Sequence, residues 1–372
     1  MLVYELKIVA VASKLASIDE AIRTSQFIRN KCLRYWIDAP KEEKVNGFSL
    51  NKFTKVLADD PEFPFAAKLN SMARQASAER AWFAISRFFD NCKKGIPGKK
   101  GFPKFKSNAR SVEYKTSGWK LSDCRRYLTI TDKTGIGQLK LKGTRDLAWV
   151  QKSDIKRVRL VKRADGYYAQ FCIKADREED CTPTGNIVGI DVGIKEFYAD
   201  SKGVTIANPK FLRKSELKLK KLQRRVSKKK KGSSNRRKSI NKLGRLHLKV
   251  SRQRNDFATK TARALCTSND VIVLENLNVK SLLKNHKLAK SISDASWSMF
   301  RTKLEYFGSL FSRQVIAVNP AYTSQDCSSC GNRVKKSLSA RTHVCKCGCV
   351  LDRDYNAAIN ILNKGMAGLA KT

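Results

Sequence analysis

The sequence has few acidic residues and no long apolar segment. It contains 33 Asp and Glu against 76 Lys and Arg, a formal net charge of +43. No apolar run approaches the roughly 18 residues of a transmembrane helix, and neither end carries a lipidation signal. The opening MLVYELKIVAV alternates like a strand and lacks the features of a secretory signal. We therefore expect a cytoplasmic protein with no membrane partner.

The excess of positive charge indicates a polyanionic partner, because a chain with this charge repels itself in isolation. The charge is concentrated in residues 209–254, which contain twenty Lys and Arg and one acid, Glu216. Leucines and valines interspersed among these cations predict helices that lie along a phosphate backbone. Nucleic acid is the expected partner, and the nucleoid the expected location.

The N-terminal half predicts strands with a helical insert. Residues 15–92 are expected to be helical, and strand-like runs extend from Ser111 to about Lys174. An aromatic stripe with Trp82, Phe83, Phe88 and Phe89 is interpreted as core packing. A basic loop, KKGIPGKKGFPKFKS, separates helices from strands. Its Phe102 and Phe105 are equally consistent with base stacking and with anchoring the loop.

The polar segment REEDCTPTG marks the expected boundary to the second half. Beyond it the order is IVGIDV, KEFYAD and VTIA as strands, a basic helical region over 209–267, the strand VIVLEN, a helix in WSMFRTKLEYFGSLF and the strand QVIAVNP. Three consecutive strands followed by strands alternating with helices are typical of an RNase H-like α/β sheet. No internal repeat is evident.

Three acids in this second half stand where carboxylates are costly. Asp191 and Glu275 each end an apolar strand, and Asp354 opens the small-residue helix DYNAAINIL. Each taken alone has a structural explanation, as a turn cap, a solvent contact or a helix cap. Asp352, two residues before Asp354, is the alternative candidate for the third metal ligand. Three acids in separate elements of one sheet favour a shared site.

Converging carboxylates repel one another unless cations bind between them. Mg²⁺ or Mn²⁺, which prefer oxygen ligands, are the expected ions. Two such ions about 4 Å apart activate a water and stabilise the leaving oxygen in phosphodiester hydrolysis. The sequence thus predicts a divalent-metal-dependent nuclease with Asp191, Glu275 and Asp354 as both catalytic residues and metal ligands.

Five of the eleven cysteines cluster in residues 327–349. Cys327 and Cys330 form a C-x2-C pair, and Cys345 and Cys347 follow as a C-x-C pair. This pattern predicts a structural Zn²⁺ held by four thiolates. Cys349 and His343 remain alternative ligands. The other six cysteines are scattered and are expected to be reduced, buried small residues.

IVGIDVGIKEFYADSKG, VIVLENL, the paired cysteines, LDRDYNAAINIL and the upstream GFPKFKS together resemble the TnpB family over nearly the whole chain. This family is transposon-associated, and its RuvC-like nuclease is related to that of type V CRISPR effectors. The resemblance implies an RNA-guided DNA endonuclease that uses one RuvC-like site. The implied partners are a guide RNA and a double-stranded target DNA that carries a short flanking motif. We expect a monomer that binds one RNA.

The resemblance also implies a multidomain α+β organisation. A β-barrel-like wedge domain would comprise residues 1–14 and 93–182, with residues 15–92 as a helical recognition lobe. A RuvC-like nuclease domain would comprise residues 183–320 and 351–372, with a zinc ribbon inserted at 321–350. In the family correspondence, Asp191, Glu275 and Asp354 match the metal-binding acids, and Cys327, Cys330, Cys345 and Cys347 match the ribbon.

Two other functions remain open. A non-cleaving RNA-guided or sequence-specific DNA-binding regulator would use the acids only structurally. A DDE-type transposase would join 3′ ends rather than only cut. The presence of all three acids favours cutting.

Overall fold

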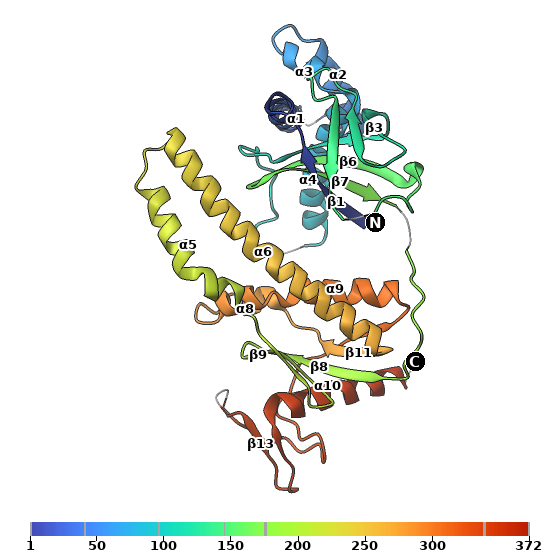
Figure 1. The fold of residues 1–372 in the computed structure, drawn as a ribbon, viewed down its shortest axis with the longest axis vertical. Coiled ribbons are helices and arrows are strands. Elements are labelled where there is room, and N and C mark those ends of the chain that lie inside the picture. Colours follow the sequence, from blue (N-terminus) through green and yellow to red (C-terminus); the bar gives the residue numbers. More distant parts are fainter. Residues whose placement is uncertain are drawn as a thin grey trace. The chain divides into compact units, whose positions relative to one another are not determined.

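The computed structural model describes residues 2–40, 42–95, 97–144, 146–174, 177–337 and 340–370. The chain forms two compact units, residues 1–176 and residues 177–372. Both units contain helices and strands (Figure 1). The expected multidomain α+β fold is therefore confirmed.

The first unit combines a seven-stranded sheet with helices that follow its first strand. Its strands are β1 (Leu2–Val9), β2 (Ser111–Lys115), β3 (Trp119–Leu121), β4 (Tyr127–Ile130), β5 (Gln138–Lys142), β6 (Ile155–Arg163) and β7 (Gly166–Ile173). Its helices are α1 (Ala12–Asp38), α2 (Gly47–Asp59), α3 (Pro64–Lys68), α4 (Ser71–Lys93) and the short 3₁₀ turns η1 (Thr116–Gly118) and η2 (Lys152–Asp154).

This sheet curls, as its connectivity shows. The strand order is β2-β6-β7-β1-β5-β4-β3, and every neighbouring pair is antiparallel. Only the three residues of η1 connect β2 and β3, the first and last strands of that order, so the two edges must approach each other. One hydrophobic core joins Ile28 and Leu33 of α1 to Tyr114 and Phe171 of the sheet.

Helix α4 does not bury the aromatic stripe that the sequence predicted as core. Its buried residues are mostly small: Ala73, Ala76, Ser77, Ala78, Ala81 and Ile85. Phe83 is 56% exposed and Phe89 is 43% exposed. The core interpretation is therefore wrong for these two residues, because α4 uses its small side chains for close packing against α1, α2 and β2.

The second unit contains a five-stranded sheet, five helices longer than one turn and a small hairpin. Its strands are β8 (Ile187–Val192), β9 (Glu196–Asp200), β10 (Thr205–Ala207), β11 (Val271–Glu275), β12 (Gln314–Val318), β13 (Thr342–Val344) and β14 (Val350–Asp352). Its helices are α5 (Phe211–Ser227), α6 (Ser234–Ser268), α7 (Val279–Leu282), α8 (Ala289–Ala295), α9 (Trp297–Leu310) and α10 (Arg353–Leu369).

The five-stranded sheet has the order β10-β9-β8-β11-β12. Strands β8, β9 and β10 pair antiparallel, whereas β8, β11 and β12 run parallel. Helices α6 and α9 cover one face, where Ile190 and Leu274 enter the larger core, and α10 covers the other, where Val273 packs with Ile361 (Figure 1). The expected order of three strands followed by strands alternating with helices is present.

Candidate functional site

Two of the predicted acids lie side by side at the ends of parallel strands. The register pairs Leu274 with Ile190, so Asp191 and Glu275 are the next residues on β8 and β11. Successive strand residues point to opposite faces of a sheet. Because Ile190 and Leu274 face α6 and α9, the acids that follow them face α10.

Helix α10 lies unusually close to this face. A Cβ built at Gly189 would lie 2.3 Å from the carbonyl oxygen of Ala358, so only glycine fits at that point on β8. A Cβ at Gly365 would lie 2.5 Å from the side chain of Val273 on β11. These close approaches fix the start of α10, and with it Asp354, near the ends of the two strands.

Asp352 and Asp354 have different roles at the start of α10. The Asp352 carboxylate accepts hydrogen bonds from the backbone N–H of Asp354 (2.8 Å) and of Tyr355 (3.2 Å), which makes Asp352 the N-cap. The Asp354 carboxylate instead contacts Arg341 Nη1 at 3.0 Å and Arg353 Nη2 at 3.0 Å. Thus capping, the structural explanation considered for Asp354, applies to Asp352.

The pKa of Asp191 reflects both burial and the neighbouring acids. Burial raises the pKa of Asp191 well above its usual range, and the neighbouring carboxylates of Glu275 and Asp354 raise it further, while Arg353 opposes the shift. Burial also raises the pKa of Glu275, against the effects of Thr323 and Lys364. Burial and the neighbouring acids therefore disfavour the ionised form of Asp191 more than Arg353 favours it.

The carboxylates are too widely spaced for a single small cage. Among the described residues, the one group of three or more acidic, His or Cys side chains gathered closely enough to hold a single metal ion is a cysteine cluster. Carboxylate oxygens at the end of a sheet nevertheless suit Mg²⁺ or Mn²⁺, which keep several water ligands and take only one or two carboxylates each. The donor set fits such ions.

Polar residues missed by the sequence analysis support the acids. Thr323 is 3% exposed, and its Oγ1 donates a hydrogen bond to Glu275 Oε1 at 2.5 Å. Asn360 of α10 donates to the carbonyl oxygens of Thr323 (2.9 Å) and Asp326 (2.6 Å). Asn356 and Asn360 are four residues apart and therefore share a helix face. Two asparagines four residues apart in the sequence were the signal that could have indicated these supporting contacts.

The four predicted cysteine ligands converge. Cys327, Cys330, Cys345 and Cys347 place their sulfurs within 4.8 Å of one another. Burial alone would raise the pKa of Cys327, but backbone N–H groups of Cys330 and Ser329, with His343 and Cys347, lower it to about 5. Four converging thiols, one of them readily ionised, fit a tetrahedral Zn²⁺ site.

The two alternative ligands lie outside this group. The backbone carbonyl of Cys349 accepts a hydrogen bond from the N–H of Cys345 at 2.9 Å. His343 is fully buried on β13, with its Nδ1 2.5 Å from Lys336 Nζ. The cluster also contacts the last helix, because Asn356 Oδ1 accepts from the N–H of Ser328 at 3.0 Å.

The remaining cysteines only partly follow expectation. Cys32, Cys172 and Cys266 are buried and Cys181 is partly exposed, whereas Cys92 and Cys124 are exposed. Burial was therefore wrongly predicted for these last two.

Over the described residues, no helix combines the length and apolarity needed to cross a membrane.

Comparison with known proteins matches two sequence families. A family described as "Probable transposase" matches residues 170–286, and one described as "Cas12f1-like, TNB domain" matches residues 297–361. Together these stretches include all three acids and the four clustered cysteines. A solved structure titled "Cryo-EM structure of the Cas12f1-sgRNA-target DNA complex" has a similar fold, with a TM-score of 0.55 and 18% identity, covering 94% of this chain and 82% of that chain.

Two relatives extend over most of the chain. A "Putative RNA-guided DNA endonuclease" of Streptomyces pristinaespiralis is 33% identical over 317 residues, which is 83% of this chain and 75% of the relative. The "Putative RNA-guided DNA endonuclease InsQ" of Escherichia coli (strain K12) is 28% identical over 335 residues, 85% of this chain and 78% of the relative. These matches, with the ordered motifs, establish that the chain belongs to the TnpB family.

Proposed function

We propose that the protein is an RNA-guided DNA endonuclease that cleaves phosphodiester bonds at one RuvC-like site. The names of its two long relatives support this class of activity. The observation that carries the proposal is the placement of Asp191 and Glu275 on neighbouring parallel strands, facing the helix that begins with Asp354.

The proposed domains follow the sequence analysis. Residues 1–14 and 93–182 would form the wedge domain and residues 15–92 the recognition lobe. Residues 183–320 and 351–372 would form the RuvC-like domain, and residues 321–350 the zinc ribbon. The strand order β10-β9-β8-β11-β12 supports an RNase H-like nuclease.

The three acids would hold divalent cations, which supply a water nucleophile and charge stabilisation when bound. Thr323 would orient the Glu275 carboxylate by its hydrogen bond. Asp352 would keep the first turn of α10 formed, so that Asp354 stays near the strand ends. Arg341 and Arg353 balance the Asp354 charge in the absence of metal.

Cleavage of a matched plasmid tests the proposal. Full-length protein is purified with its copurifying RNA, which is sequenced to define the target. We expect cutting only with Mg²⁺ or Mn²⁺. Asp191→Asn and Glu275→Gln should each lower the cleavage rate roughly 10³-fold, because several kcal/mol of charge stabilisation are lost. Asp256→Asn, at an exposed carboxylate on α6, is the matched control.

The same assay separates the alternatives. Target binding without cutting in any divalent metal would favour a regulator. Joined 3′ ends would favour a transposase, the activity in the description of one matched family. Undiminished cutting by Asp191→Asn would refute the assignment of the site.

A further inference from the structure

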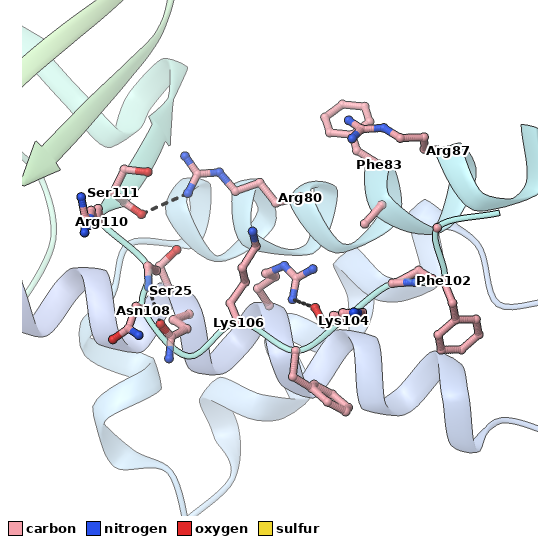
Figure 2. Close-up of a pocket in the computed structure, with 17 residues that line it drawn as sticks. Ser25, Arg80, Phe83, Arg87, Phe102, Lys104, Lys106, Asn108, Arg110 and Ser111 are labelled. Atoms are coloured by element: carbon pink, nitrogen blue, oxygen red, sulfur yellow. Dashed lines mark hydrogen bonds between the residues drawn. The ribbon is translucent and has the colours of Figure 1, made fainter. Parts of the chain in front are cut away.

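The first unit contains a cavity of about 780 Å³ between α1, α4 and the chain segment that leads into β2. We call residues 101–110 the strap. Pockets of roughly 300–1,000 Å³ are typical of sites for one small organic molecule, a size that suits a nucleotide. Figure 2 shows the strap running beside α4, with Lys104 and Lys106 on the strap and Arg80, Phe83 and Arg87 on the helix.

The strap is held firmly against α1. The Asn30 side chain pairs with the backbone of Lys106, donating to its carbonyl at 2.8 Å and accepting from its N–H at 2.9 Å. The N–H of Ala109 donates to Gln26 Oε1 at 2.6 Å. The cavity is therefore built into the fold.

The charged residues that line it are all cations. The described lining residues include six cations and no Asp or Glu: Arg29, Arg80, Arg87, Lys104, Lys106 and Arg110. Cations lining one concave surface concentrate positive potential, which attracts phosphate.

Arg29 is the strongest indication of an anionic ligand. It is only 7% exposed, and the hydrogen bonds described for it go to two neutral groups, the Asn30 side chain and the Lys104 carbonyl. Burial lowers its pKa, and Arg80 lowers it further, while Cys32 opposes the shift. A buried charge is normally paired. A phosphate in the cavity would supply the missing counterion.

The aromatic ring of Phe83 gives the cavity a second kind of contact. Phe83 lies one turn from both Arg80 and Arg87 on α4, and its ring is 56% exposed. Alternating cations and exposed aromatic rings are typical of surfaces that bind single-stranded nucleic acids, where bases stack on the rings.

We propose that this cavity binds an unpaired nucleotide of an RNA or DNA strand, with its phosphate near Arg29 and its base against Phe83. This inference deepens the proposed function by naming a second contact with nucleic acid. It concerns binding alone, so it does not require cutting.

Photocrosslinking locates the contact in the full chain. Single-stranded 5-iodouridine RNA and 5-iododeoxyuridine DNA are crosslinked to Asp191→Asn protein without divalent metal, and the attached peptides are identified by mass spectrometry. We expect peptides from residues 81–87 or the strap. RNA-only or DNA-only crosslinks there would identify the source of the nucleotide. Crosslinks confined to residues 177–372 would overturn the proposal.

Affinity measurements test the aromatic contact. Phe83→Ala should weaken binding of a single strand roughly tenfold, as expected for one lost stacking contact. Phe48→Ala, at a ring 69% exposed on α2, should leave affinity unchanged. Equal affinities of the two variants, or no preference for single strands over duplex, would overturn the proposal. Cutting is scored separately, so loss of cutting with intact binding would count only against the nuclease.

Discussion

Two carboxylates, Glu113 in the first unit and Asp191 in the second, have opposite electrostatic surroundings. Glu113 on β2 is 3% exposed and contacts Arg80, Arg157 and Arg159. Burial opposes ionisation, but hydrogen bonds from the arginines lower its pKa. Asp191 is only partly exposed, yet the charges that act on it include two further acids, and its pKa is raised.

We interpret Glu113 as a structural charge and Asp191 as part of the proposed site. The protein itself neutralises Glu113, so that carboxylate needs no external ion. At Asp191, burial and the neighbouring acids disfavour the charge, which costs stability unless a cation binds. The four clustered thiols resemble Asp191 in this respect, and Arg29 shows the converse case, a buried cation whose counterion would come from a ligand.

Removing the zinc ligands should give the largest effect. Structural zinc contributes about 10–16 kcal/mol of apparent binding free energy in small domains. Cys330→Ser should therefore lose the metal and expose residues 321–350 to proteolysis, as measured by elemental analysis and limited digestion. Cys92→Ser, at an exposed cysteine outside the cluster, is the control. Unchanged zinc content in Cys330→Ser would contradict the four-thiolate site.

Glu113→Gln should give the next largest effect. Breaking a buried ion pair by removing one partner costs about 3–5 kcal/mol, so the melting temperature of the first unit should fall. The folded pKa is lowered, so this stabilisation is fully present above the unfolded value near 4.3 and is lost as pH falls through the folded pKa. Melting curves of wild type and variant should converge at low pH. Equal stabilities at pH 7 would contradict the role of Glu113.

Asp191→Asn should have a smaller effect of opposite sign. Without Mg²⁺ the variant removes repulsion among the acids, so we expect a higher melting temperature than wild type. A gain of about 1 kcal/mol corresponds to roughly 2–4 °C. Added Mg²⁺ should reverse the order, because only the wild type retains the full ligand set. A lower melting temperature than wild type without metal would show that Asp191 is balanced like Glu113.

Residue patterns predicted the strands and the candidate ligands, but not their supporting contacts. Asp191 and Glu275 stood out because each ends an apolar run, and the cysteine spacing is specific. Thr323 and Arg341 lie in irregular segments, where a polar residue carries no periodic signal. Their contacts with Glu275 and Asp354 depend on tertiary packing alone.

Phe83 shows a different limit. Aromatic residues at helical spacing normally mark the buried face, and here the alanines of α4 mark it instead. The choice depends on how closely α1 approaches α4, which the sequence of α4 does not encode by itself. The exposed Phe83 side chain instead lines the basic cavity.

Because Asp354 lies in α10, it is synthesised after Asp191 and Glu275. β8 and β11 leave the ribosome well before α10, so a nascent chain carries Asp191 and Glu275 while the third acid is still missing. The basic helices α5 and α6 emerge in the same interval. If these helices bind nucleic acid as proposed, a growing polypeptide would meet it before the proposed acidic site is complete.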